Sequence, residues 1–149
     1  MTEDPMNCRA IGIVRSPFKE RGDAPCQGRR TDEISSIEIS PEYQEGLDGL
    51  KTGDDLFVLC WFDRSDRSVL KTRRQGTEDG PLRGVFSTRS PARPNPISLT
   101  LVKLVEITGG TLRVRGLEAL DNTPVLDIKP YSEGIDTPRE TMGCDGKLL

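Results

Sequence analysis

About seven short segments of this chain alternate between apolar and polar side chains, and no segment shows a long helical period. Such alternation is typical of strands, because successive side chains of a strand point to opposite faces. The segments are Arg9–Arg15, Ser36–Ser40, Asp55–Phe62, Gly84–Ser87, Ile97–Ile107, Thr111–Leu117 and Pro124–Ile128. Frequent turns separate them, and there is no strand–helix–strand rhythm that would indicate a Rossmann sheet. The pattern predicts an all-β fold, a small, mainly antiparallel β-barrel with long loops and one short helix.

Two features define the expected strands most sharply. The turn Thr108-Gly109-Gly110 lies between two alternating segments and predicts a β-hairpin. The segment Asp55–Phe62 is apolar at nearly every position, so both of its faces should be covered. The short helix is expected after Ser40, which can cap it, with Pro41 at the first helical position.

The chain of 149 residues fits a single domain, 1–149, with residues 1–8 and 132–149 as loosely packed extensions. Two long polar loops, Phe18–Glu33 and Asp63–Arg83, interrupt the strand pattern. Loops of this length in a small domain are usually functional or mobile.

The absence of histidine limits the chemistry that is available. Four widely spaced cysteines without a CxxC pair, in a chain without histidine, predict no metal site. A general base must then be a carboxylate, Lys, Tyr, Cys or water, which excludes triads built on imidazole. No apolar run is long enough to cross a membrane and no signal-peptide core precedes the first strand, so we expect a soluble, cytoplasmic protein.

Charge is distributed unevenly along a chain whose net charge is −3. Residues 64–93 contain eight basic and three acidic side chains, whereas residues 117–149 contain seven acidic and three basic ones. A local basic stripe suits a polyanionic partner such as RNA. A solvated loop with balanced charges explains the same numbers equally well.

The segment Gly84–Leu104 places Arg89 and Arg93 among three prolines, directly before a predicted strand. Proline fixes its own φ and favours an extended residue before it, so the segment is stiff and its arginines are already oriented. Guanidinium groups held in this way suit carboxylates, phosphates or base edges. The ordinary alternative is an irregular loop with solvated arginines.

Three further polar clusters are Pro25-Cys26-Gln27, Asp63-Arg64 and the turn 120–124 that contains Asp121 and Asn122. The last is a plain turn signal by itself. Asp127, in an apolar strand, is expected to be buried and therefore to need a counter-charge. Arg89 or Arg93 is the candidate partner, which would make the pair a structural strut.

Several stretches together resemble the TsaA/TrmO-like methyltransferases, which modify N6-threonylcarbamoyladenosine beside the anticodon of tRNA. They are STRSPARPNPI at 87–97, DNTPVLDIKPY at 121–131, IGIVRSPF at 11–18 and Pro25-x-Gln27. The resemblance implies an S-adenosylmethionine-dependent enzyme on a small β-barrel, acting as a homodimer with the cofactor near the subunit interface. Ser98 and Asn122 stand where the family commonly has glycine, and Cys26 where many members have arginine.

The resemblance also implies a set of cofactor contacts. They fall on Pro25, Cys26, Gln27, Asp63, Arg64, Arg89, Leu99, Ala119, Leu120, Asp121 and Asn122. Arg89 and Arg93 would engage the threonyl carboxylate or tRNA phosphates, and Asp127, Asp121 or water would accept the proton that leaves the methylated nitrogen. Two alternatives stay open: a non-catalytic sensor of S-adenosylmethionine, and a plain RNA-binding barrel.

Overall fold

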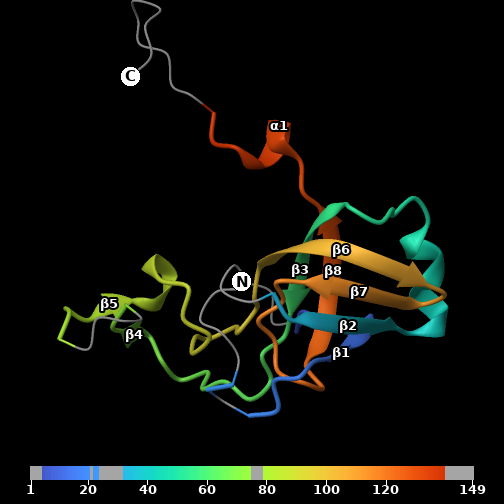
Figure 1. The fold of residues 1–149 in the computed structure, drawn as a ribbon. Helices are drawn as coiled ribbons and strands as arrows, with labels where there is room; N and C mark the ends of the chain where they lie inside the picture. Colours follow the sequence, from blue (N-terminus) through green and yellow to red (C-terminus); the bar gives the residue numbers. More distant parts are fainter. Residues whose placement is uncertain (1–4, 21, 24–31, 75–78, 140–149) are drawn as a thin grey trace, which may run out of the picture.

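Six antiparallel strands form a closed barrel in the order β1-β2-β7-β6-β3-β8 (Figure 1). The computed structural model describes residues 5–20, 22–23, 32–74 and 79–139. The barrel strands are β1 (Gly12–Arg15), β2 (Ile34–Ile39), β3 (Asp55–Cys60), β6 (Thr100–Thr108), β7 (Thr111–Arg115) and β8 (Pro124–Pro130). The predicted all-β barrel is therefore confirmed.

Two places in the barrel depend on glycine. The predicted hairpin is confirmed: β6 and β7 pair up to Thr108–Thr111, and Gly109 makes the turn with a φ of 58°. Gly12 lies where β1 pairs with both β2 and β8. A Cβ atom on Gly12 would lie 2.4 Å from the carbonyl oxygen of Glu38. This position thus needs glycine for β1 to approach β2 closely.

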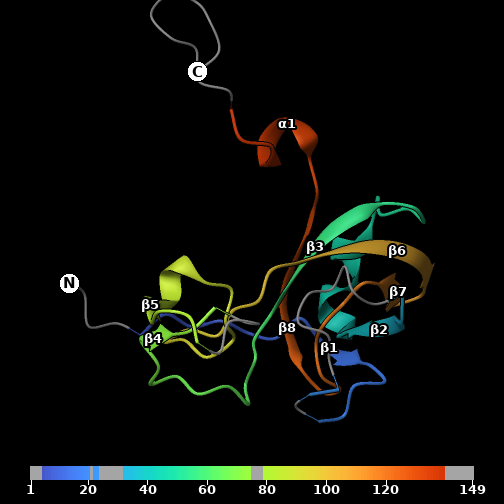
Figure 2. The same ribbon diagram turned by 60° about the vertical axis from the view of Figure 1, so that its left-hand side comes forward.

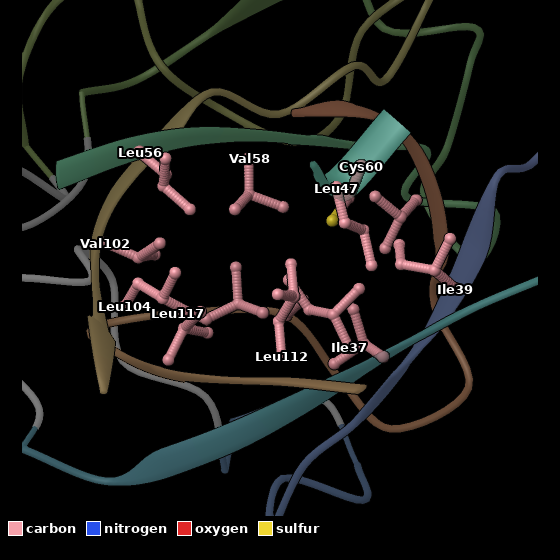
Figure 3. Close-up of a cluster of buried hydrophobic side chains, with 14 residues drawn as sticks. Ile37, Ile39, Leu47, Leu56, Val58, Cys60, Val102, Leu104, Leu112 and Leu117 are labelled. Carbon is pink, nitrogen blue, oxygen red and sulfur yellow. The ribbon is translucent and has the colours of Figure 1, made fainter. Parts of the chain in front are cut away.

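The alternating apolar residues of the strands fill the interior of the barrel, as Figure 3 shows. Fully buried side chains come from all six strands, for example Val14, Ile37, Val58, Leu104, Val114 and Val125. Leu47, from the helix between β2 and β3, packs against the same cluster. On β3 only the inward face is fully buried, while Phe57 and Leu59 on the outward face are half-buried. The covering expected for both faces of this strand is thus complete on one face only.

The helix predicted after Ser40 is present as a 3₁₀ helix, η2 (Pro41–Leu47), with Pro41 in its first turn. The expected cap is wrong, because the Ser40 side chain makes no capping hydrogen bond. The backbone of Ser40 is used instead: its N–H donates to Ile11 at 2.9 Å and its carbonyl accepts the N–H of Tyr43 at 2.9 Å.

The strand predicted over Gly84–Ser87 is also wrong for most of its length. Only β5 (Arg83–Gly84) is extended, and it pairs with β4 (Lys71–Thr72). Val85–Ser87 form a 3₁₀ turn, η3. The hydroxyl groups of Ser87 and Thr88 donate to the carbonyls of Gly84 and Val85, at 2.8 and 2.9 Å, so local side-chain hydrogen bonds replace a sheet partner here.

The segment between β3 and β6 extends away from the barrel, and we call this segment the arm. It carries β4, β5 and η3, and Figures 1 and 2 both show it beside the barrel. After β8, the short helix α1 (Glu133–Asp136) buries none of its residues. The description of the chain as one domain with loosely packed ends stays a prediction. Within the described residues, no helix has the length and apolar character required to cross a bilayer.

Candidate functional site

Strand order brings three connections to one end of the barrel, which we call the mouth. Ile13 of β1 pairs with Pro124 at the start of β8, and Cys60 at the end of β3 pairs with Val125. Val58 of β3 pairs with Thr100 at the start of β6. The β1–β2, β3–β6 and β7–β8 connections therefore leave from the same end. Helix η2 and the β6–β7 turn lie at the opposite end (Figure 1).

Every cofactor contact that the resemblance implied belongs to one of these three connections. Asp63, Arg64, Arg89 and Leu99 lie between β3 and β6, and Ala119, Leu120, Asp121 and Asn122 lie between β7 and β8. Pro25, Cys26 and Gln27 belong to the β1–β2 connection, outside the described residues.

Asp121 ties the β7–β8 connection to the β1–β2 connection. Its carboxylate accepts hydrogen bonds from the backbone N–H of Ser16 at 3.0 Å and from Nζ of Lys19 at 2.8 Å. Its own N–H donates to the carbonyl of Phe18 at 2.7 Å. The hydrogen bond from Lys19, followed by that from Ser16, lowers the pKa of Asp121 from its ordinary value. The carboxylate is thus ionised at neutral pH.

Arg64 joins the third connection to the same point. Its Nη2 donates to the carbonyl of Asp121 at 2.8 Å and to the hydroxyl of Thr123 at 3.0 Å. Its Nε lies 3.5 Å from the carboxylate of Asp63. The Asp63-Arg64 cluster and the Asp121 turn, which the resemblance implied separately as cofactor contacts, are therefore in direct contact.

Asn122 has a φ of 66°, a left-handed conformation that asparagine adopts more readily than most residues. Its N–H donates to the carbonyl of Val14 at 2.9 Å, and its side-chain oxygen accepts a hydrogen bond from Arg15. Asparagine thus keeps a turn that glycine also allows, and it adds a side-chain contact to β1.

A second set of contacts holds the start of β6 at the mouth. The hydroxyl of Thr100 donates to the carboxylate of Glu118 at 3.0 Å, which brings Leu99 and Ala119 to the same rim. Arg89 donates from Nη2 to the carbonyl of Leu99 at 2.7 Å. Leu99 is 42% exposed, whereas Ala119 is buried. The rim therefore combines guanidinium groups with an open apolar side chain.

The expected strut between Asp127 and an arginine is not formed. Asp127 lies on β8 opposite Leu59, half-exposed, and pairs with Nζ of Lys129 at 2.9 Å. Arg93 donates from Nη2 to the carbonyls of Val85 and Thr88, the latter at 2.7 Å, so it fixes the η3 turn of the arm. The expected burial of Asp127 is wrong because its side chain faces outward, where Lys129 supplies the counter-charge. Nε of Arg93 is buried and has no hydrogen-bond partner among the described atoms.

Two kinds of chemistry receive no support from the described residues. Burial raises the pKa of the Cys60 thiol to about 12, so this cysteine is not a nucleophile at neutral pH. The described part of the chain contains no cluster of three or more residues suited to a metal ion.

Several mouth residues lay outside the sequence-based set, namely Ser16, Lys19, Glu118 and Thr123. Ser16 could have been predicted, because it belongs to IGIVRSPF, one of the stretches that carried the resemblance. Lys19 follows that stretch directly, but its spacing to Asp121 is 102 residues and gives no local signal.

The lowered pKa of Asp121 gives the first prediction. A carboxyl group whose pKa is lower in the folded state stabilises the fold above its unfolded pKa, and this contribution is lost as pH falls through the folded pKa. In a carbon-detected NMR titration, Asp121 should titrate below its ordinary range. Lys19→Gln should move the midpoint upward, because it removes the largest cause of the shift. An unchanged midpoint in that variant would refute the Lys19 contact.

Comparisons with known proteins bear on this site. The family model described as the tRNA-methyltransferase O N-terminal domain matches residues 13–137. A "Probable S-adenosyl-L-methionine-binding protein" of Methanothermobacter thermautotrophicus is 53% identical over 137 residues, covering 92% of this chain and 98% of that protein. An "S-adenosyl-L-methionine-binding protein" of Archaeoglobus fulgidus is 46% identical over 139 residues, covering 93% and 98%.

A solved structure shows the same architecture. The crystal structure of TrmO from Pseudomonas aeruginosa is 30% identical in sequence and superposes with a TM-score of 0.73. The match covers 93% of this chain but only 61% of that one. The present chain therefore spans about three fifths of the solved protein.

Proposed function

The chain belongs to the tRNA-methyltransferase O family, and from this premise we propose that it methylates N6 of threonylcarbamoyladenosine beside the anticodon of tRNA, using S-adenosylmethionine. One observation carries the proposal. Of the residues that the resemblance implied for the cofactor, those that the structure describes come from two connections far apart in sequence, yet Arg64 and Asp121 meet at one mouth, where Nη2 of Arg64 donates to the carbonyl of Asp121.

The residues at the mouth fit the chemical groups of S-adenosylmethionine. The carboxylate of Asp121 suits an amino or hydroxyl group, and the guanidinium groups of Arg64 and Arg89 suit a carboxylate. The exposed side chain of Leu99 offers an apolar contact for a ring. Bound at this site, S-adenosylmethionine supplies an activated methyl group on its sulfonium sulfur.

The protein's own contribution is mainly positioning and desolvation of the two reactants. The acceptor nitrogen belongs to a ureido group and loses a proton during or after methylation. Asp121 and Asp127 are the proposed acceptors for that proton, and the half-exposed side chain of Asp127 can pass it to water. In this proposal Arg89 and Arg93 hold the threonyl carboxylate or a phosphate.

The proposal extends to the partners of the protein. The basic side chains of the arm would bind the phosphates of the anticodon stem. The protein would act in the cytoplasm as a homodimer. Several large apolar side chains on the arm and at the rim are exposed, which supports a second subunit there: Leu70, Leu82, Phe86, Ile97 and Leu99.

The test combines the purified chain, S-adenosylmethionine with a labelled methyl group, and tRNA with or without the threonylcarbamoyl group. We expect label in the tRNA that carries the threonylcarbamoyl group and no label in the unmodified tRNA. Calorimetry on the same sample measures cofactor binding. Cofactor binding without any label transfer would support the sensor. Absence of cofactor binding would leave the RNA-binding barrel.

A further inference from the structure

A cation–π pair that follows directly after β3 has no part in the proposed methyl transfer. Trp61, the only tryptophan of the chain, forms a β-bridge with Ile97 and precedes the Asp63-Arg64 cluster of the mouth by two residues. The guanidinium carbon of Arg67 lies 5.0 Å from the centre of the indole ring. Trp61 is half-buried, and Arg67 is exposed.

Two hydrogen bonds fix the guanidinium in this position. Nε of Arg67 donates to the carbonyl of Pro94 at 2.7 Å, and Nη2 donates to the side-chain oxygen of Asn95 at 3.1 Å. With the indole on one side, these bonds set both the place and the orientation of the guanidinium group. An exposed cation–π pair adds little to folding stability. The main effect of the arrangement is therefore to orient the guanidinium group of Arg67.

We propose that Trp61 and Arg67 form a platform on which one unpaired nucleobase of RNA stacks. This inference rests on the proposed function, because it takes RNA to be the substrate. Proteins read unpaired bases by stacking them on aromatic rings or on guanidinium planes. The platform adjoins the mouth, and a base must leave its stack before an enzyme can modify it. A neighbouring base held on the platform would keep the anticodon loop of the RNA open.

A phosphate contact is the competing role for Arg67, and lysine can replace arginine in that role. Lysine has no planar group on which a base can stack, so Arg67→Lys separates the two roles. Arg113 is a control outside the arm: it lies on β7, and its Nη1 donates to the carboxylate of Glu106 at 2.8 Å. Among the described residues, Arg113 makes no cation–π contact.

The experiment measures the affinity of anticodon stem-loop RNAs, intact or with one abasic position at a time, by fluorescence anisotropy. We expect Arg67→Lys to weaken binding of the intact RNA about tenfold, a typical loss for one stacked base. Arg113→Lys should change it less than twofold. At one loop position, removal of the base should weaken the wild type about tenfold and the Arg67→Lys variant not at all. The dependence of affinity on salt should be equal in the wild type and in Arg67→Lys, because the charge is kept.

Trp61 reports on the same event without any substitution. The intact RNA should quench its fluorescence, and the RNA that lacks the critical base should quench it less.

Equal affinities of the wild type and Arg67→Lys for intact RNA would overturn the platform. So would an equal effect of every abasic position on the wild type and on Arg67→Lys. A loss of affinity for S-adenosylmethionine in Arg67→Lys would also overturn it, because the stack would then hold the adenine of the cofactor. RNA binding by the wild type together with label transfer would leave the proposed function standing in either case. No RNA binding by the wild type would refute both.

Discussion

Replacing Arg64 with alanine is expected to weaken binding of S-adenosylmethionine by about 10- to 100-fold. The substitution removes two hydrogen bonds from a charged donor, to the carbonyl of Asp121 and to the hydroxyl of Thr123. A hydrogen bond to a charged group is worth about 1.5–3 kcal/mol, and about 1.4 kcal/mol corresponds to a factor of ten. The expected loss is that of about one such bond rather than two, because the Arg64 side chain is partly exposed and water replaces part of the contact. Without the two hydrogen bonds, the β7–β8 connection is no longer held against the β3–β6 connection. Titration calorimetry measures the change.

Arg113 provides the matched control for this prediction. It is also an arginine with an exposed side chain and a carboxylate partner, Glu106 at 2.8 Å, but its partner strands meet near the opposite end of the barrel. Arg113→Ala should leave the affinity within twofold of the wild type. Arg64→Lys, which keeps the charge and one donor, should recover part of the loss. Wild-type affinity in Arg64→Ala would remove Arg64 from the site.

The barrel was predictable from the sequence because its signals are local. In the β6–β7 hairpin, alternation on both sides of Gly109-Gly110 fixes the strands and the turn together. The order of the strands is a different matter. β3 lies between β6 and β8, which begin 40 and 64 residues after it ends, and no local pattern encodes those neighbours. The convergence of three connections at the mouth follows from this order, so only the family resemblance anticipated it.

Two of the errors share a physical cause: a partner close in sequence satisfies the polar group first. Asp127 was expected to need Arg89 or Arg93, but Lys129, two residues along the same strand, lies on the same face. Over Gly84–Ser87, hydroxyl groups of the same segment bind its carbonyls and keep it out of a sheet. Residue type alone could not show that these local contacts would form.

The cation–π contact between Arg67 and Trp61 depends instead on partners that are distant in sequence. The two residues are six positions apart, but the guanidinium is held by Pro94 and Asn95 from the far end of the arm. The stiffness of the proline segment was readable from the sequence. Its position against Arg67 depends on how the whole arm folds back, which the sequence does not indicate.

Leu104→Ala is expected to reduce the free energy of unfolding by about 3 kcal/mol, within the range of about 2–5 kcal/mol for buried leucines. Leu104 is fully buried in β6, opposite Val114 of β7, so truncation leaves a cavity in the barrel core. Leu70 on the arm is 65% exposed, and Leu70→Ala should cost less than about 0.5 kcal/mol. Urea denaturation followed by far-ultraviolet circular dichroism measures both values.

Leu104 forms backbone hydrogen bonds with Gly53 and Asp54, at the end of the barrel opposite the mouth. The folded Leu104→Ala variant should therefore bind S-adenosylmethionine as tightly as the wild type, whereas weakened binding by the folded variant would show that the mouth depends on core packing at a distance.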